Sequence, residues 1–450
     1  MSSKRGGGKN QDSAESMSSE SRKAMSSAAV SPARENALQI LTRYRRSGEL
    51  TASDCPQADN RRLADSIAFG TVQNGRYLDA VLESFVRSGL RSLHPTVREI
   101  LRLSAFQILF LDRVPDSAAV NDAVTLCREQ KCGFAAGFVN AVLRNLSRKK
   151  DGIVVADPAV RFSHPDWIMD RLVQENGQAF AEAFLEANQK LPDLRLQICT
   201  DRCGADDYRA MLEKAGVEVL DQNPELGSVL IRPCKVTDLP GYEEGFFYVQ
   251  DDAARTAVAI CGLQPGMRVL DACAAPGGKS VAAAMAGAEV LACDLSEKRL
   301  QRCRENFSRL RLEIPVCRQD AAEFRPEWEN SFDCVLADVP CTGTGIIRKH
   351  PEIRDKTEEE LFSLLPIQQA ILRNLARYVK PGGLLLYSTC SVLRDEDENQ
   401  VSQFLNEQDD FIIDAPSARK GYSCQNGMLR SWPQQNGNDG FFAAKLRKKP

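Results

Sequence analysis

The sequence predicts a multidomain protein: an all-α bundle, a small α+β module and a C-terminal α/β domain with a mainly parallel sheet. Three observations predict this class. The chain has 450 residues, enough for about three domains. Apolar residues recur at helical spacing from residue 31 to residue 150. From residue 246 onward, short apolar strands alternate with amphipathic helices.

Composition is that of an ordinary globular protein, with 43% apolar and 26% charged residues. No apolar run approaches the length of a membrane span, so no membrane partner is expected. Residues 1–29 lack the apolar centre of a signal peptide, and a cytoplasmic protein is therefore expected. The Ser, Gly, Lys and Glu content of the first segment predicts a disordered tail over residues 1–30.

The cysteines and histidines argue against a metal site. The chain has 15 Cys but no Cys-x-x-Cys pair, and its only histidines are His94, His164 and His350. Most of the cysteines are expected to be small buried hydrophobic residues in a reducing compartment. A catalytic cysteine must therefore be identified from its local context.

Residues 31–150 are expected to form a helical bundle. Val97–Leu111 is apolar over much of its circumference, which predicts the central helix. The region carries 18 Lys and Arg against 12 Asp and Glu, with basic clusters at Arg43–Arg46 and Arg144–Lys150. On charge alone, solvated helix faces are the preferred explanation of these clusters, and Tyr44 is expected in the core.

Residues 151–245 change character and predict the small α+β module. Its expected helices and strands lie over residues 167–190, 194–198, 206–215, 217–220 and 229–232. The α/β domain then spans residues 246–450. In this domain strands are expected to end at residues 271, 294, 320, 338 and 390, with 411–414 and 441–446 closing the sheet. Helices are expected over 279–286, after Ser296, and over 358–378 and 395–406.

A glycine turn follows the strand that ends at Asp271. Gly-Lys-Ser at residues 278–280 matches the end of a phosphate-binding loop, but Cys273 occupies the place of that motif's first glycine. The next strand ends at Asp294, about twenty residues after the turn, where an acid binds ribose hydroxyls in nucleotide-binding α/β units. The pattern predicts a nucleoside cofactor rather than a triphosphate.

Acidic or thiol side chains end the successive strands. The carboxyl ends of parallel strands meet at one edge of a sheet, so these side chains are expected to converge there. They are Asp271, Asp294, Asp320, Asp338 and Cys390. Val-Pro separates Asp338 from Cys341, so a second thiol is expected at the same edge.

Three motifs in the α/β region resemble the S-adenosylmethionine-dependent RNA cytosine-5 methyltransferases. They are Asp-Ala-Cys-Ala-Ala-Pro-Gly-Gly-Lys at 271–279, Asp-Val-Pro-Cys at 338–341 and Ser-Thr-Cys-Ser at 388–391. The helical region resembles the antitermination factor NusB through Asn-Asp-Ala-Val at 121–124 and Phe-Val-Asn-Ala-Val-Leu-Arg at 138–144. Together they resemble the bacterial 16S ribosomal RNA methyltransferase family usually called RsmB, Sun or Fmu.

This resemblance implies a NusB-like RNA-binding domain over residues 31–150, a Rossmann-like class I methyltransferase domain and S-adenosylmethionine as cofactor. It implies that Cys390 adds to carbon 6 of a cytosine, that Asp338 acts at the ring nitrogen and that Cys341 assists release. Lys279 is expected to steer Asp338 or the base. Asp294 is expected to bind the ribose hydroxyls of the cofactor, and Asp320 its adenine edge. The other residues expected to contact the cofactor are Cys273, Ala274, Ala275, Pro276, Gly277, Gly278, Lys279 and Asp338.

Several alternatives stay open. DNA cytosine-5 methyltransferases attack through the cysteine of a Pro-Cys motif, which here would be Cys341. The RNA partner could be another ribosomal RNA site or a transfer RNA instead of the 16S ribosomal RNA site. The protein could also be a non-catalytic RNA-binding protein instead of an enzyme. Gln250-Asp251 and Arg348–His350 resemble segments that line the site or contact RNA. A monomer is expected.

Overall fold

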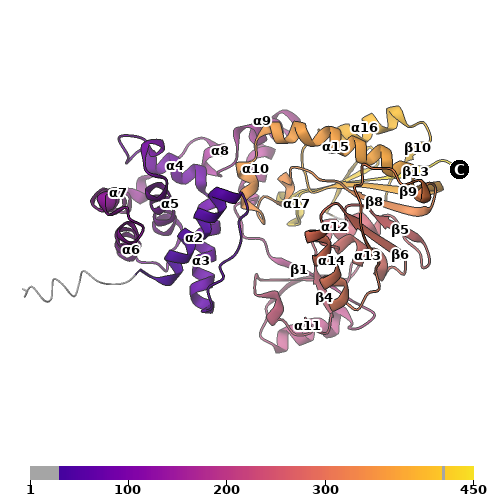
Figure 1. Cartoon of the computed structure of the whole chain (residues 1–450), viewed down its shortest axis with the longest axis horizontal. Coiled ribbons are helices and arrows are strands. Elements are labelled where there is room, and N and C mark those ends of the chain that lie inside the picture. The colour runs from indigo at the N-terminus through magenta and orange to yellow at the C-terminus, as the bar shows by residue number, and fades with distance from the viewer. Residues whose placement is uncertain (1–29, 418–420) are drawn as a thin grey trace, which may run out of the picture. The chain divides into compact units, whose positions relative to one another are not determined.

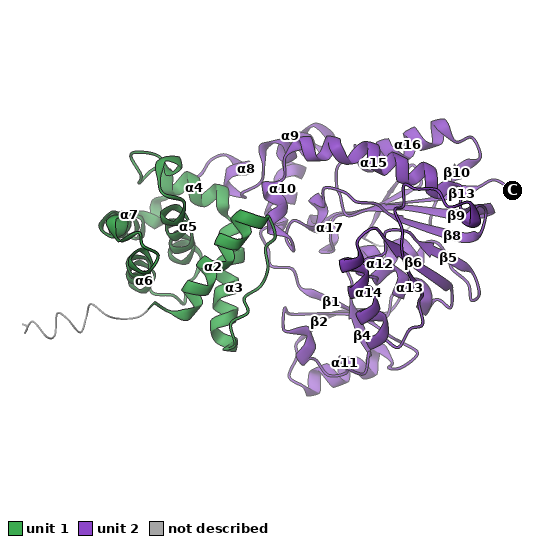
Figure 2. Ribbon diagram, viewed as in Figure 1, with its two compact units in different colours: residues 1–154 green, residues 155–450 purple. Residues whose placement is uncertain are grey.

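The computed structural model describes residues 30–417 and 421–450, which divide after Val154 into two compact units (Figure 2). Apart from Val30, the tail expected over residues 1–30 lies outside this part of the chain. None of the helices in the described ranges combines the length and apolar character that crossing a bilayer requires.

The first unit is a helical bundle built around α5 (Pro95–Phe110), as the apolar circumference of this segment predicts. α5 packs against α2, α3, α4 and α7, and also against α6. Tyr44 on α2 is buried, as expected. The surrounding helices are α2 (Pro32–Ser47), α3 (Ala58–Gln73), α4 (Gly75–Glu83), α6 (Asp116–Glu129) and α7 (Ala136–Lys149), with short 3₁₀ turns η1 (Leu90–Ser92), η2 (Gly133–Ala135) and η3 (Lys150–Gly152).

The second unit begins with three helices that share an apolar core with Trp432. Phe180 and Phe184 meet its ring edge-on, with centroids 4.8 and 6.1 Å away. A four-stranded antiparallel sheet follows, in the order β2-β3-β1-β4. Because β4 belongs to this sheet, the sheet extends past residue 245, where the α+β module was expected to end. These elements are α8 (Pro158–Arg161), α9 (Asp166–Asn176), α10 (Gln178–Ala187), β1 (Leu194–Ile198), α11 (Ala205–Lys214), β2 (Val219–Asn223), β3 (Ser228–Ile231), η4 (Val236–Asp238) and β4 (Phe247–Val249).

The rest of the second unit is built on a mixed sheet that has nine strands within the described residues (Figure 1). The run β7-β6-β5-β8-β9 is parallel, and β13, β12 and β11 continue it antiparallel, with β10 also pairing with β13. The strands are β5 (Arg268–Asp271), β6 (Glu289–Asp294), β7 (Val316–Arg318), β8 (Phe332–Asp338), β9 (Val379–Thr389), β10 (Phe411–Ile413), β11 (Ser423–Gln425), β12 (Met428–Ser431) and β13 (Phe441–Lys448).

Helices cover both faces of this sheet. Apolar residues of α12, α13 and α14 form the core on one face, and those of α15 and α16 form the core on the other. Strand order reverses at β5, because β6 lies on one side of it and β8 on the other. In open α/β sheets such a reversal opens the crevice that binds ligands. The helices are α12 (Asp252–Ala259), α13 (Gly278–Met285), α14 (Glu297–Arg309), α15 (Glu358–Ala376), α16 (Glu398–Glu407) and α17 (Pro433–Asn436), with 3₁₀ turns η5 (Pro326–Trp328), η6 (Thr344–Ile346) and η7 (Pro351–Asp355).

Several strands differ from the sequence prediction. β7 ends at Arg318, two residues before the end expected at Asp320. β9 begins at Val379, whereas its start was expected at Gly383, and it therefore includes Pro-Gly-Gly at 381–383. Its register with β8 shifts there, so the irregular residues are absorbed within the pair. The hairpin of β11 and β12 was not predicted. Its turn is Asn426-Gly427, and both residues have the positive φ that a tight hairpin needs (51° and 77°).

Candidate active site

The parallel strands bring the predicted side chains to one edge of the sheet. Asp271 ends β5, Asp294 ends β6 and Asp338 ends β8, and these strands are joined through direct pairing. Asp338 is in register with Ser388 of β9, two residues before Cys390. Asp271, Asp294, Asp338 and Cys390 therefore lie at one edge of the sheet as expected, whereas Asp320 lies two residues beyond the end of β7.

The glycine turn is shaped by the packing behind it. Gly277 has φ 103°, and a Cβ at this position would lie 2.7 Å from the ring of Phe307. A Cβ at Gly278 would lie 2.8 Å from the side-chain nitrogen of Gln250. Both missing Cβ atoms thus face the protein, so close packing is one reason for the glycines besides the sharp turn. No side chain caps the helix α13 that starts here, so its first N–H groups are not used by a cap.

Asp271 is fully buried and ties this turn to the sheet. The hydroxyl of Ser280 on α13 donates a hydrogen bond of 2.7 Å to its carboxylate. Burial raises the pKa of Asp271 to about 7, although this hydrogen bond and the Lys279 charge oppose the rise. Its position beneath the turn indicates a role in holding α13.

Asp294 lies against the turn from the neighbouring strand. Its carboxylate accepts the backbone N–H of Ala275 (3.3 Å) and of Ser296 (2.9 Å), and Arg299 lies 3.5 Å away. A carboxylate has about four acceptor positions, so it retains capacity for hydroxyl donors. Beyond the end of β7, Asp320 accepts the N–H of Ala322 at 2.9 Å and closes a local turn. These groups fit a nucleoside. The Asp294 carboxylate can accept hydrogen bonds from the two ribose hydroxyls, and it lies beside the uncapped N-terminus of α13.

Asp338 is held through both of its carboxylate oxygens. Lys279 Nζ lies 2.6 Å from one oxygen, and the hydroxyl of Ser388 donates to the other at 2.8 Å. The Lys279 side chain is only 9% exposed, and its ammonium lies 5.0 Å from the centroid of the Phe441 ring, within cation–π range. The ion pair brings together the two residues that the sequence suggested would act in concert.

The two thiols of the candidate site are in contact. Cys341 Sγ lies 3.3 Å from Cys390 Sγ, and both residues are partly exposed. The pKa of the Cys341 thiol is raised well above its ordinary value, first by the hydrogen bond with Cys390 and then by burial. Cys341 therefore stays protonated at neutral pH, and its S–H can donate a hydrogen bond to the sulfur of Cys390.

A buried carboxylate that sequence reasoning missed supports the loop of Cys341. Glu396 accepts the backbone N–H of Thr342 at 2.8 Å, the hydroxyl of Thr342, and the side-chain amide of Gln368 at 3.0 Å. Its backbone carbonyl accepts the hydroxyl of Tyr387 at 2.6 Å. Glu396 thus joins the loop after β8 to the end of β9, the two segments that carry the thiols. The sequence signal was weak, since acids are frequent in the run 395–398.

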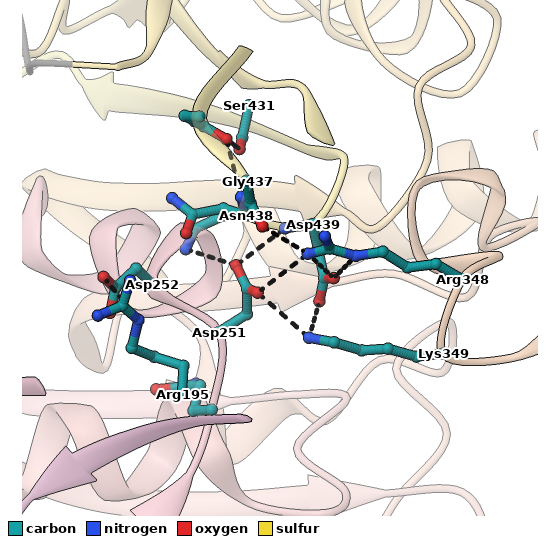
Figure 3. A network of polar contacts seen from close by, with 12 residues as sticks. Arg195, Asp251, Asp252, Arg348, Lys349, Ser431, Gly437, Asn438 and Asp439 are labelled. Atoms are coloured by element: carbon teal, nitrogen blue, oxygen red, sulfur yellow. Dashed lines mark hydrogen bonds and ion pairs between the residues drawn. The ribbon is translucent and has the colours of Figure 1, made fainter. Parts of the chain in front are cut away.

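Arg348 and Lys349 belong to an ion-pair network rather than to an open basic surface (Figure 3). Lys349 lies 2.6 Å from Asp439 and 3.2 Å from Asp251, and Arg348 lies 3.1 Å from Asp439. Asp251 also caps α12 through the N–H of Ala253. The network joins the loop before η7, the start of α12 and the start of β13.

The same loop contacts the backbone of Cys390. The N–H of Gly345 donates to the carbonyl of Cys390 at 2.9 Å, and the carbonyl of Gly345 accepts the N–H of Gly440 at the same distance. A Cβ at Gly345 would overlap the Gly440 carbonyl, so only glycine fits. His350, which the resemblance placed in this segment, is 54% exposed and lies 3.2 Å from Glu352.

Three family models match the chain. Residues 258–447 match 16S rRNA methyltransferase RsmB/F, residues 31–148 match the NusB family, and residues 164–237 match the ferredoxin-like domain of RsmF/B-like methyltransferases. These ranges cover the α/β region, the helical unit and most of the segment between them.

Curated relatives and solved structures agree with these models. The ribosomal RNA small subunit methyltransferase B of Pseudomonas syringae pv. tomato is 34% identical over 88% of this chain and 91% of its own length. The protein of the same name from Serratia proteamaculans is 33% identical over 86% of this chain and 91% of its own length. The crystal structure of PH0851 has a TM-score of 0.78 and 25% identity, and the match covers 94% of this chain and 100% of that one.

NSun6 from Pyrococcus horikoshii, solved with SFG, shares the fold with a TM-score of 0.59 at 18% identity, over 64% of this chain and 99% of its own. The family match and the strand-end site lead to the same conclusion. The chain belongs to the RsmB/F family of 16S ribosomal RNA methyltransferases, and it is an S-adenosylmethionine-dependent ribosomal RNA methyltransferase.

Proposed function

We propose that this enzyme methylates carbon 5 of a cytosine in 16S ribosomal RNA through a transient bond between Cys390 and carbon 6. The observation that carries the proposal is the contact of the Cys390 and Cys341 sulfurs, 3.3 Å apart, one strand from the Asp338–Lys279 pair. Carbon 5 of cytosine is a poor nucleophile, and addition of a thiolate to carbon 6 turns it into an enamine carbon that can attack an electrophile.

The cofactor fits the turn that leads into α13 and the acid beside it. Residues 273–279 would lie against S-adenosylmethionine, Asp294 would accept its ribose hydroxyls and Asp320 would contact the adenine edge. When bound there, the cofactor supplies the electrophilic methyl group. The chain's own residues bind the cytosine, activate it and later release it.

Cys390 is assigned as the nucleophile through the resemblance of its Ser-Thr-Cys-Ser motif at 388–391 to that of the RNA cytosine-5 methyltransferases. The raised pKa of Cys341 keeps it a neutral thiol, which can donate a hydrogen bond to the Cys390 sulfur. The Lys279 ammonium, 2.6 Å from Asp338, supplies the proton, which passes through Asp338 to the ring nitrogen as electrons move into the ring. The ring nitrogen returns this proton on release.

Release reverses the addition. Carbon 5 loses its proton to solvent, the carbon 6–sulfur bond breaks, and the electron pair of that bond returns to Cys390. Cys341 lies against the departing sulfur, so its S–H can stabilise the thiolate as it forms. Loss of Cys341 should therefore slow release more than addition.

The target nucleotide is tested by comparing 16S ribosomal RNA from a deletion strain and its parent with bisulfite sequencing. The proposal expects one cytosine to lose its methyl mark in the deletion strain and to regain it when the wild-type gene, but not the Cys390→Ala gene, is returned. An unchanged 16S profile combined with a lost mark in transfer RNA or in another ribosomal RNA would transfer the same chemistry to that substrate.

A further inference from the structure

The helical unit contains a hollow of about 440 Å³ whose walls carry four arginines. Arg45 comes from α2 and belongs to the basic cluster at residues 43–46. Arg91 comes from η1, and Arg98 and Arg102 lie one turn apart on α5. The other lining residues are Asp79, Glu83 and Leu90. We call this site the arginine hollow.

The acids around the arginine hollow are already engaged. Arg102 forms a two-pronged pair with Asp79, at 2.7 and 2.6 Å, and also pairs with Glu99. Arg45 lies 3.4 Å from the same Glu99 oxygen. Glu83 accepts the backbone N–H of Leu90 at 3.1 Å. The second oxygen of Glu99 is buried without a hydrogen bond from any described residue, but the two arginines paired with this carboxylate shield its charge.

Arg91 and Arg98 have no such partner among the described residues. Arg98 is half-buried, and its Nε–H is enclosed with no acceptor in this part of the chain. A buried donor without an acceptor is unfavourable, and Arg98 also stands one turn from the like charge of Arg102. Solvated helix faces, the preferred explanation of the basic charge from sequence alone, do not account for a guanidinium held in this way.

We propose that the arginine hollow binds a phosphate group of the RNA backbone, with Arg91 and Arg98 as its main ligands and Arg45 beside them. Guanidinium groups offer paired N–H donors that match two oxygens of a phosphate. A phosphate would also give Arg91 and Arg98 an anionic partner, which the described residues do not provide. The inference rests on the proposed RNA substrate and adds to it a contact in the helical unit, separate from the methylating site.

The test measures RNA affinity against salt for a double variant, Arg91→Ala with Arg98→Ala, using a fluorescent 16S ribosomal RNA fragment. Loss of phosphate contacts should weaken binding about tenfold or more at moderate salt, and reduce the slope of log K against log salt by roughly 0.7–0.9 per contact. The matched control, Arg113→Ala with Arg128→Ala, removes the same charge from exposed positions of the same unit and should keep the wild-type slope. Equal affinity and slope for the two double variants would overturn the inference.

Two further arms separate the explanations. Replacing Arg91 and Arg98 with Lys keeps the charge but removes the paired donors, so binding should be intermediate, with an unchanged circular dichroism spectrum. Inorganic phosphate should raise the melting temperature of wild-type protein and not of the Ala variant. If phosphate binding is lost while RNA affinity is unchanged, the hollow takes free phosphate and the RNA assignment is wrong. If wild-type protein itself fails to bind or methylate the RNA, the proposed function fails instead.

Discussion

Lys279 Nζ lies 2.6 Å from Asp338 Oδ2, in an ion pair that joins the first residue after the glycine turn to the end of the neighbouring strand. The pair connects the segment expected to hold the cofactor with the carboxylate expected at the cytosine ring. The Lys279 side chain is almost fully enclosed, whereas that of Asp338 is 32% exposed, so solvent screens the pair only in part. A change at either residue should therefore affect the chemical step.

Replacing Lys279 with Met should lower the single-turnover rate of methyl transfer by about 100-fold, because Asp338 loses its cation and its orientation. RNA affinity should change little, since the ammonium is enclosed. Quenched-flow measurement of methyl transfer under saturating RNA checks the rate. Lys298→Met removes the same charge from an exposed position on α14 and should keep the wild-type rate; an equal loss in both variants would contradict the role of the pair.

Replacing Asp294 with Ala should weaken S-adenosylmethionine binding by about 10- to 100-fold, because one charge-assisted hydrogen-bond acceptor for the ribose is lost. Titration calorimetry measures the dissociation constant directly. Asp409→Ala, at a position outside the site, is the control. Unchanged cofactor affinity in Asp294→Ala would show that the ribose is bound elsewhere.

Replacing Glu396 with Ala should slow product release, because the loop of Cys341 loses the two hydrogen bonds from Thr342 that fix it against the segment after β9. A covalent protein–RNA complex that survives denaturing gel electrophoresis should then accumulate with ordinary RNA, less than in Cys341→Ala and more than in wild type. Glu360→Ala, an exposed acid on α15, serves as control and should give no complex. Glu396→Gln, which can still accept hydrogen bonds, should release product faster than Glu396→Ala; if both accumulate no complex, the supporting role is wrong.

Asp271 should give the protein a pH-dependent stability. Its pKa in the folded state is about 7, above its value in the unfolded chain, so folding favours the protonated form. The contribution to stability is full below the unfolded pKa and is lost as pH rises through about 7, with a slope of at most about 1.4 kcal/mol per pH unit. Asp271→Asn keeps an acceptor for Ser280 and cannot ionise. The melting temperature of this variant relative to wild type should therefore rise between pH 5 and pH 8, and a constant difference would contradict the assignment.

The strand-end acids and the paired thiols were predictable because strand periodicity fixes where each parallel strand ends, and parallel strands end at one edge. Thus β8 ends at Asp338, as expected. The reason for Gly277 and Gly278 was only partly predictable, because the space behind them is filled by Phe307 and Gln250, which are distant in sequence. The same limit applies to Glu396 and to the pairing of Lys349 with Asp439, both of which depend on tertiary contacts. The β11–β12 hairpin, by contrast, carried a local signal in Asn426-Gly427.

The most direct test of the central claim is covalent trapping with RNA that carries 5-fluorocytosine at the target, which blocks release because fluorine replaces the proton lost from carbon 5. The account predicts that wild-type protein and Cys341→Ala form a denaturation-resistant adduct whose mass maps to the peptide containing Cys390, and that Cys390→Ala forms none. An adduct in Cys390→Ala that maps to Cys341, together with none in Cys341→Ala, would contradict the account and make Cys341 the nucleophile.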